Sequence, residues 1–238
     1  MESKTLRSHR VIGAVADGTP RTCAFYDLGG VGYCAVRVGG DAFQVLALDG
    51  LTVQSASPRL GREIRAISAH GEWTYCAIDS QVWCFLRARF VGLAEAAPAQ
   101  IDRLETVGGL LLACGDTFVQ GWARDDEGAM SRRQVPSKAL CFEVDLEDVC
   151  VCHPPTYVNK ILLGSGDGRL ELWNIRSEKR VHAYASITGK ESITHVAPSG
   201  ALDIVAVSRS TGKIHILDAR KDAVLASPVD GGGSSVGG

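Results

Sequence analysis

Short runs of apolar residues, many of them alternating with polar residues, follow one another along almost the whole chain. Alternation with a period of two is typical of β-strands, and the 3.6-residue period of an amphipathic helix is nearly absent. The closest helical pattern, at 92–104, is interrupted by Pro98. Strands are predicted at 32–38, 42–48, 63–69, 74–79, 81–87, 117–123, 159–165, 169–175, 203–209 and 213–219.

The strand pattern repeats. Residues 158–186 and 202–227 each contain an apolar strand, a turn with glycine, an alternating strand, a polar turn and a third apolar strand. Trp173 in the first segment matches Leu217 in the second, 44 residues later. The same pattern fits less closely around Leu46, Phe85 and Trp122, at steps of 39, 37 and 51 residues. We infer five units.

A period near 40 residues with three or four strands per unit is typical of a β-propeller, in which each unit is one blade. Neighbouring blades cover both faces of each sheet, so strands that are apolar at nearly every position are expected. An immunoglobulin-like sandwich also has many short strands but predicts no such repeat. The expected fold is therefore an all-β propeller with about five blades.

We expect blades near 10–58, 59–97, 98–140, 141–187 and 188–229, followed by a flexible Gly/Ser-rich tail at 230–238. Propellers avoid unpaired edges by closing the ring. Five blades are few for closure, so we predict an incomplete ring or the first part of a tandem propeller. The strand expected at 10–15 would then pair outside this segment.

The composition of the chain limits the classes of partner that it is expected to bind. The chain has 25 Lys and Arg against 27 Asp and Glu, a net charge of -2, which implies no general attraction to nucleic acid or anionic membrane. It has no run of 18 uncharged apolar residues and no apolar core of a secretory signal near its start. We expect a soluble intracellular protein without membrane contact.

The eight cysteines are scattered and most lie in apolar runs, which favours buried thiols in a reducing compartment. One local cluster, Cys150, Cys152 and His153, lacks the distant second pair of a zinc site. In a strand, Cys150 and Cys152 share one face, which suits two core positions. No metal is predicted.

Residues 164–168, GSGDG, could suggest a phosphate-binding loop. Such a loop needs a following helix, but the next residues alternate as a strand. A tight hairpin turn is predicted instead, with Gly166 and Gly168 at positive φ and Asp167 between them.

Other enzymatic motifs are also incomplete. The segment STGK at 210–213 has Val207 where a P-loop needs glycine and Ile214 where it needs Ser or Thr. The histidines lack zinc-protease spacing, and paired carboxylates lie in polar connections. Neither catalysis nor a cofactor or small-molecule substrate is expected.

The segment 153–177 resembles a characteristic blade of one family, the WD-repeat subunit of the UTP-B subcomplex of the small-subunit processome. The residues that carry this resemblance are His153, Pro154, Thr156, Tyr157, Asn159, Lys160, Leu162, Leu163, Gly164, Ser165, Gly168, Leu170, Leu172, Trp173 and Asn174. Weaker agreement extends to 10–17, 63–70 and 201–225. Asn174 stands where the general WD signature has Asp.

The resemblance implies a scaffold subunit in the nucleolus that supports pre-ribosomal RNA processing. Its implied partners are the other UTP-B WD-repeat proteins, the pre-ribosomal RNA and a small nucleolar RNA. Family members are much longer, with two tandem propellers. A generic WD-repeat adaptor, such as a substrate receptor of a ubiquitin ligase, is the alternative and would lack nucleolar localisation.

Two groups of residues are singled out, one for structural roles and one for contacts with partners. Structural roles are expected for Gly164, Gly168, Trp173, Asn174 and Gly212, and a Trp173 buried between blades would make Trp173→Ala cost roughly 3–5 kcal/mol. Candidate contacts to RNA or protein partners are Lys4, Arg7, Arg10, Arg132 and Arg133, for which solvated surface charge is the competing interpretation. RNA binding through these residues would weaken steeply with salt.

Overall fold

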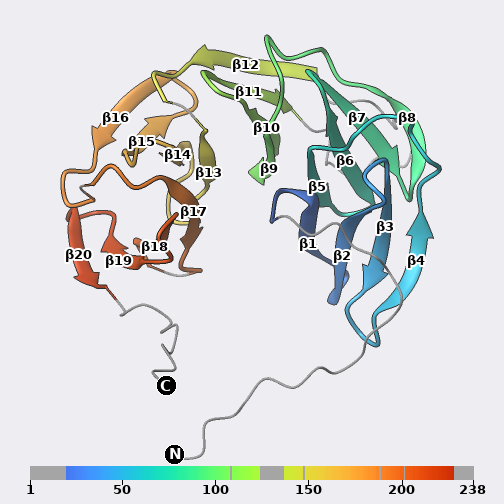
Figure 1. Cartoon of the computed structure of the whole chain (residues 1–238), viewed down its shortest axis with the longest axis horizontal. Coiled ribbons are helices and arrows are strands. Elements are labelled where there is room, and N and C mark those ends of the chain that lie inside the picture. Colours follow the sequence, from blue (N-terminus) through green and yellow to red (C-terminus); the bar gives the residue numbers. More distant parts are fainter. Residues whose placement is uncertain are drawn as a thin grey trace, which may run out of the picture. The chain divides into compact units, whose positions relative to one another are not determined.

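The computed structural model describes residues 20–107, 109–123, 137–146, 148–187, 189–200 and 202–227. Within them, twenty strands form five four-stranded antiparallel sheets, and the strands of each sheet lie side by side in chain order (Figure 1). Five sheets agree with the predicted number of blades, whereas β12 (Ser137–Glu143) of the third sheet runs across the boundary expected between 140 and 141. The closing strand expected at 10–15 and the tail at 230–238 lie outside the described residues, so the predicted state of the ring stays a prediction.

The sheets begin after a short 3-10 turn, η1 (Pro20–Thr22). The first contains β1 (Cys23–Leu28), β2 (Val31–Val38), β3 (Ala42–Ala47) and β4 (Thr52–Ala56); the second β5 (Ala66–His70), β6 (Trp73–Ile78), β7 (Gln81–Leu86) and β8 (Arg89–Leu93). The third contains β9 (Arg103–Val107), β10 (Leu110–Cys114), β11 (Phe118–Ala123) and β12 (Ser137–Glu143); the fourth β13 (Cys150–Cys152), β14 (Lys160–Gly164), β15 (Leu170–Asn174) and β16 (Lys179–Ala183); the fifth β17 (Ile193–Pro198), β18 (Ile204–Arg209), β19 (Ile214–Asp218) and β20 (Ala223–Ala226). No helix in the described residues has the length and hydrophobicity needed to cross a bilayer.

The described residues fall into two compact units. Unit 1 ends at Ala96 and holds the first two sheets; unit 2 begins at Ala97 and holds the other three. In unit 1, the facing sides of its sheets share one core, in which Phe43 and Phe85 meet edge to face with ring centroids 5.0 Å apart. This edge-to-face geometry is favourable for aromatic pairs.

The fourth sheet is buried on both faces. Leu162 and Leu172 pack into a core shared with the fifth sheet, whereas Ile161 and Leu163 pack into a core shared with the third. Successive residues of a strand point to opposite faces. The unbroken apolar run at 161–163 is therefore required by two neighbouring sheets, as the sequence pattern predicted.

Every sheet has a β-bulge in the pairing of its third and fourth strands. The register shifts lie between Val45 and Leu46, Cys84 and Phe85, Gly121 and Trp122, Leu172 and Trp173, and Ile216 and Leu217. The second residue of each pair is the position that we matched between the five sequence units. A bulge sharpens the local twist of a sheet, so the repeat reflects one recurring backbone feature.

Candidate binding recesses

The glycine-rich segment at 164–168 forms a hairpin turn. The amide of Gly168 donates to the carbonyl of Ser165 at 3.1 Å, and the amide of Ser165 donates to the carbonyl of Arg169 at 3.0 Å. Gly168 has φ +88°, but Gly166 does not have the positive φ that was predicted. The geometry is a three-residue connection, in which only the last loop position needs the left-handed conformation.

The same turn recurs 44 residues later. The amide of Gly212, at φ +85°, donates to the carbonyl of Arg209 at 2.9 Å, and the amide of Arg209 donates to the carbonyl of Lys213 at 2.9 Å. Both glycine-rich segments therefore connect antiparallel strands, and neither precedes a helix that could bind phosphate.

The carboxamide of Asn174 also has a local role. Its Oδ1 accepts hydrogen bonds from the amides of Arg176 at 2.9 Å and Ser177 at 3.1 Å. In the fifth sheet, Asp218 Oδ1 accepts from the two corresponding amides at 3.0 Å each. Both side chains stabilise a turn by accepting hydrogen bonds from the backbone amides two and three residues later. Asn and Asp can both fill this role.

Gly164 and Trp173 lie at sheet interfaces. A Cβ on Gly164 would lie 2.6 Å from Ile193 Cγ2 and 2.8 Å from Cys150 Sγ, so a side chain would not fit there. Trp173 is only half-buried, contrary to the burial that was expected, and it stacks on Phe142 of the third sheet with ring centroids 5.4 Å apart.

The cluster at 150–153 belongs to the core. Cys150 is 2% exposed and Cys152 is 4% exposed, both in the cluster between the fourth and fifth sheets. His153 Nε2 lies 2.6 Å from the carbonyl oxygen of Tyr157. Among the described residues, no three His, Cys, Asp or Glu side chains are grouped to hold a metal ion.

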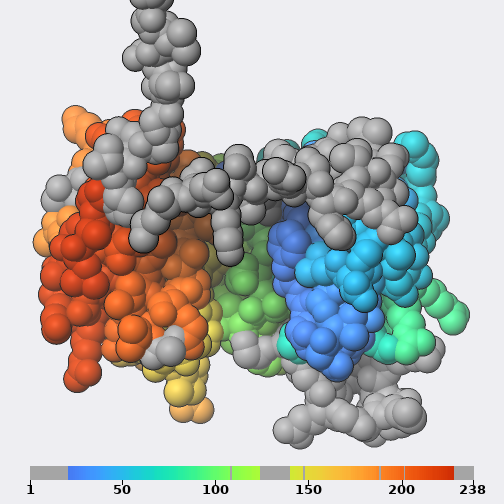
Figure 2. All heavy atoms as spheres, turned by 90° about the horizontal axis from the view of Figure 1, so that it is seen from below, coloured from blue at the N-terminus to red at the C-terminus, as the bar shows by residue number. Residues whose placement is uncertain are grey.

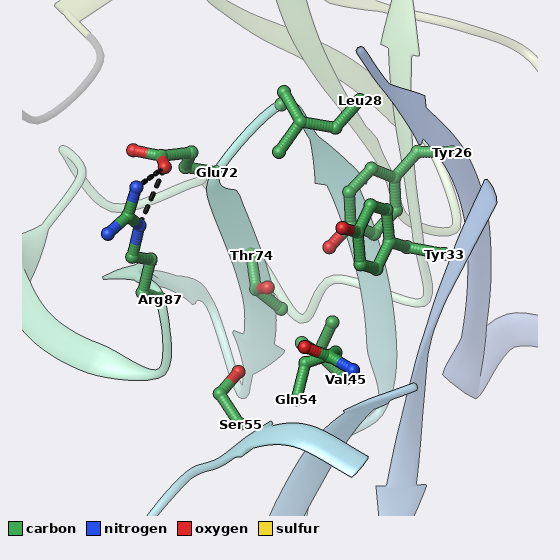
Figure 3. A pocket seen from close by; sticks show the side chains of 10 residues that line it. Tyr26, Leu28, Tyr33, Val45, Gln54, Ser55, Glu72, Thr74 and Arg87 are labelled. Carbon is green, nitrogen blue, oxygen red and sulfur yellow. Dashed lines mark hydrogen bonds and ion pairs between the residues drawn. The ribbon is translucent and has the colours of Figure 1, made fainter. Parts of the chain in front are cut away.

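The surface has a recess in each unit. Recess 1 lies between the first and second sheets and has a volume of about 300 Å³ (Figure 3). Tyr26 and Tyr33 stack along one side, with ring centroids 5.5 Å apart, and Glu72 accepts hydrogen bonds from Arg87 on the other. It is lined by Tyr26, Leu28, Tyr33, Val45, Gln54, Ser55, Gly71, Glu72, Thr74 and Arg87.

Recess 1 carries an uncharged phenol, that of Tyr26. Burial, followed by the neighbouring Tyr33 and Cys34, raises the pKa of Tyr26 to about 12. Its hydroxyl therefore remains a hydrogen-bond donor at neutral pH. The recess can bind a polar chain by hydrogen bonds, with the exposed side chain of Leu28 available for apolar contact.

Recess 2 lies between the fourth and fifth sheets and has a volume of about 550 Å³. It occupies the same place as recess 1 within its pair of sheets, beside the connections from first to second and from third to fourth strand. It is lined by Thr156, Tyr157, Lys160, Leu172, His182, Tyr184, Asp203, Ala219, Arg220, Lys221 and Asp222.

Asp222 fixes one wall of recess 2. Its carboxylate accepts hydrogen bonds from the amides of Ala185 at 3.0 Å and Ser186 at 3.1 Å, and its Oδ2 lies 3.0 Å from His182 Nε2. Burial opposes the charged form, but these hydrogen bonds outweigh it and lower the pKa of Asp222 to about 2. Asp222 therefore remains ionised and joins the fifth sheet to the end of the fourth.

Two cations of recess 2 are not paired with carboxylates. Lys160 Nζ lies 5.1 Å from the ring centroid of Tyr157, in cation–π geometry. In the described part of the chain, neither Lys160 nor Arg220 makes an ion pair, whereas Lys221 Nζ lies 3.5 Å from Asp218 Oδ2. Lys160 and Arg220 are thus available to a ligand with negative charge.

The segment that carried the family resemblance forms part of this recess. The amide of Tyr157 donates to the carbonyl of Pro154 at 3.0 Å, which closes a turn that places Thr156 and Tyr157 at the recess. The carbonyl of Asn159 accepts from the amide of Ile175 at 3.0 Å and ties the connection to the end of β15.

The candidate partner contacts Lys4, Arg7, Arg10, Arg132 and Arg133 lie outside the described residues. Sequence reasoning missed the recess residues, including Arg87, His182 and Arg220. They come from strands and turns far apart in the chain, and no local motif joins them. The resemblance at 153–177 did include Tyr157 and Lys160 and was the one available signal.

Comparison with known proteins places these features in a family. The family of the WDR36/Utp21 first beta-propeller matches residues 36–235. The chain belongs to this family. The match covers most of the chain, including most of recess 1 and all of recess 2, and it confirms the WD-repeat β-propeller predicted from the period of the strands.

Relatives of this family member have related names. The chain is 26% identical over 94% of its length to the U3 small nucleolar RNA-associated protein 21 homolog of Schizosaccharomyces pombe. It is 25% identical over 87% of its length to WD repeat-containing protein 36 of Homo sapiens. It spans about a quarter of the curated relatives it matches, 24% and 22% of these two.

A solved structure supports the fold alone. A chain in the crystal structure of the mitotic checkpoint complex superposes with a TM-score of 0.64, at 14% sequence identity, over 83% of this chain and 60% of that one. At such low sequence identity, this similarity supports the β-propeller fold of the chain and does not indicate its partners.

Proposed function

We propose that the chain is a propeller region of a non-enzymatic scaffold in the small-subunit processome, where it supports pre-ribosomal RNA processing and small-subunit biogenesis. The observation that carries this proposal is the family match over residues 36–235, joined to the Schizosaccharomyces pombe relative, which is named for association with U3 small nucleolar RNA. This name favours a ribosome-biogenesis role over a generic adaptor.

The proposed partners are the other UTP-B WD-repeat proteins, with the pre-ribosomal RNA and a small nucleolar RNA in the same particle, and the proposed location is the nucleolus. Protein contacts fit the two recesses better than RNA contacts do. Glu72 in recess 1 and Asp203 and Asp222 in recess 2 would repel phosphate, whereas the hydroxyls and cations suit a polypeptide.

A scaffold role agrees with the chemistry of the recesses. Several of their charged groups are held by contacts within the protein: Glu72 accepts hydrogen bonds from Arg87, Asp222 accepts from backbone amides beside His182, and Lys160 lies over the ring of Tyr157. Side chains arranged in this way hold a surface in one shape and bind a partner without reacting with it.

The test is recovery of the complex that contains the protein. The tagged full-length protein should copurify with U3 small nucleolar RNA and processome proteins and should be imaged in nucleoli. Its depletion should lead to accumulation of unprocessed small-subunit RNA precursors. Recovery without U3, or normal processing after depletion, would contradict the proposal.

A second test asks whether recess 2 binds partner proteins, independently of the stability of the fold. The double variant Lys160→Glu, Arg220→Glu reverses two charges that form no ion pair and should weaken copurification of the partner proteins while the protein keeps a cooperative melting transition. Arg89→Glu, at an exposed position of β8, is the matched control and should copurify normally. Equal recovery of all three proteins would remove recess 2 from the proposed interface.

A further inference from the structure

Two cysteines of the first sheet are in direct contact. The sulfur atoms of Cys23 in β1 and Cys34 in β2 lie 3.2 Å apart. In the register of the two strands, Cys23 lies opposite Val36 and Cys34 lies opposite Phe25. The cysteines are therefore diagonal neighbours on one face of the sheet, and pairing of β1 with β2 holds them together.

One of the two thiols can be reached from solvent. Cys23 is half-buried, and Phe25, the next residue of β1 on that face, is 71% exposed. Figure 2 shows β1 and β2, in blue, at the surface of unit 1. Cys34 is only 6% exposed. Tyr26 and Tyr33 lie on the opposite face, so this pair is separate from recess 1.

The contact favours an ionised thiol at Cys23. A hydrogen bond from Cys34 lowers the pKa of Cys23 to about 7 although burial opposes it, and the pKa of Cys34 is raised. Burial raises the pKa of five other cysteines: Cys76, Cys84, Cys114, Cys150 and Cys152. The thiolate is the nucleophilic form of cysteine.

We propose that Cys23 and Cys34 form a reactive dithiol site that a hydroperoxide oxidises to a cross-strand disulfide. The Cys23 thiolate attacks one peroxide oxygen, the O–O bond breaks, and Cys23 becomes a sulfenic acid while hydroxide, or an alkoxide, leaves. The Cys34 sulfur then attacks the Cys23 sulfur. An S–S bond forms, the S–O bond breaks, and the hydroxyl group leaves as water with the proton of Cys34. The thiols lose two electrons and the peroxide gains them.

The geometry needs little change for this step. A disulfide bond joins its sulfur atoms at about 2.05 Å, so the two sulfur atoms must approach by roughly 1 Å. Rotation of the two side chains can supply this movement while the strands stay paired. Thiols such as dithiothreitol would reverse the bond by exchange.

The test is oxidation of the full chain with one equivalent of hydrogen peroxide, followed by alkylation and peptide mapping without reductant. We expect one disulfide that joins Cys23 to Cys34, seen as a loss of two hydrogens from the segment that holds both residues and reversed by dithiothreitol. Cys34→Ala removes both the resolving thiol and the hydrogen bond to Cys23, so oxidation should be slower and should stop at a sulfenic acid on Cys23 that dimedone labels. Cys23→Ser should leave Cys34 reduced.

Cys141, which is also half-buried but has no thiol contact among the described residues, is the internal control. Cys23 should react about tenfold faster than Cys141. Equal rates, a link to a different cysteine, or peroxide consumption without a link would overturn the proposal. Because Cys34→Ala could unfold the sheet, its circular dichroism is compared with that of the wild type, and the wild-type peptide map decides the proposal independently of the variant.

Discussion

At the scale of single residues, a buried carboxylate in the fourth sheet organises its neighbours. Glu171 is 2% exposed, and its two oxygens accept hydrogen bonds from Trp173 Nε1 and from Arg180, each at 2.9 Å. A buried carboxylate is stable only when its oxygens are paired. Glu171 thus holds the indole of Trp173 and the outer strand β16 in place.

Removal of this carboxylate should destabilise the fold. Glu171→Ala leaves Trp173 Nε1 without an acceptor and Arg180 without its carboxylate, so the free energy of unfolding should fall by roughly 1–3 kcal/mol. Chemical denaturation measures the change. Glu143→Ala, at an exposed position of β12, should stay within about 0.5 kcal/mol of wild type. A loss at Glu171 no larger than at Glu143 would show that these hydrogen bonds contribute nothing.

Alanine substitutions at the two hairpin glycines, Gly168 and Gly212, should distinguish the cost of backbone strain from the cost of a steric clash. Gly212 has φ +85°, and the position that a Cβ would take there is open space, so Gly212→Ala should cost only the left-handed strain, roughly 1–2 kcal/mol. At Gly168, with φ +88°, a Cβ would also lie 2.4 Å from the carbonyl oxygen of Gly189. Gly168→Ala should therefore lower the melting temperature further than Gly212→Ala. The reverse order would contradict the turn geometry.

The lowered pKa of Asp222 predicts that the stability of the fold depends on pH. Its folded-state pKa of about 2 lies below the value of about 4 expected in the unfolded chain. The stabilisation by its carboxylate is therefore fully present above about pH 4 and is lost as the pH falls toward 2. Asp222→Asn should lower the melting temperature at pH 7, and this deficit should shrink near pH 2. The exposed Asp116→Asn serves as control, and a deficit constant with pH would contradict the argument.

At the scale of elements, one bulge position takes side chains of different size in the five sheets. Trp122 is fully buried in the third sheet, whereas Trp173 in the fourth is half-buried and stacked on Phe142. The bulge sets the direction of the side chain, and the neighbouring sheet decides how deeply it is covered.

These two tryptophans should differ in their contribution to stability. Trp122→Ala should lower the free energy of unfolding by roughly 3–5 kcal/mol, the range for a large aromatic in a packed core. Trp173→Ala should cost less, because part of its ring is already in contact with water. Denaturation of both variants tests the order, and a larger loss for Trp173 would show that its stacking on Phe142 outweighs burial.

At the scale of the whole molecule, the last sheet leaves aliphatic side chains exposed. Ile214 in β19 is 41% exposed, and Val224 and Leu225 in β20 are 38% and 54% exposed. Figure 2 shows this sheet, in red, at the surface of unit 2. Exposed aliphatic side chains on the last sheet of a series can mark a surface that another body covers.

Expressed alone, the chain should self-associate through this surface. Light scattering should show a mass that rises with concentration, and the double variant Ile214→Lys, Leu225→Lys should restore a smaller species. Lysine substitution at Thr211, an exposed position of the β18–β19 turn, is the control and should not change the mass. A monodisperse wild-type monomer with a cooperative melt would show that these residues need no cover.

The sequence by itself determined ten of the twenty described strands, the five-unit repeat, the hairpin turns and the family. Each of these depends on local rules: alternation defines a strand, Gly168 and Gly212 mark the ends of tight turns, and a run such as 161–163 requires two covered faces. The resemblance at 153–177 is local as well, since it lies within one blade.

Only the tertiary structure decided which side chains meet. His182 reaches Asp222 of the next sheet, and Arg103 of the third sheet donates to the carbonyl of Thr194 in the fifth sheet at 3.2 Å, across 91 residues. The Cys23 and Cys34 contact depends on strand register. The burial of Trp173 was predicted from its strand position, but the depth of cover depends on the adjacent blade. Long-range contacts follow from the sum of many weak packing terms, which a local pattern does not encode.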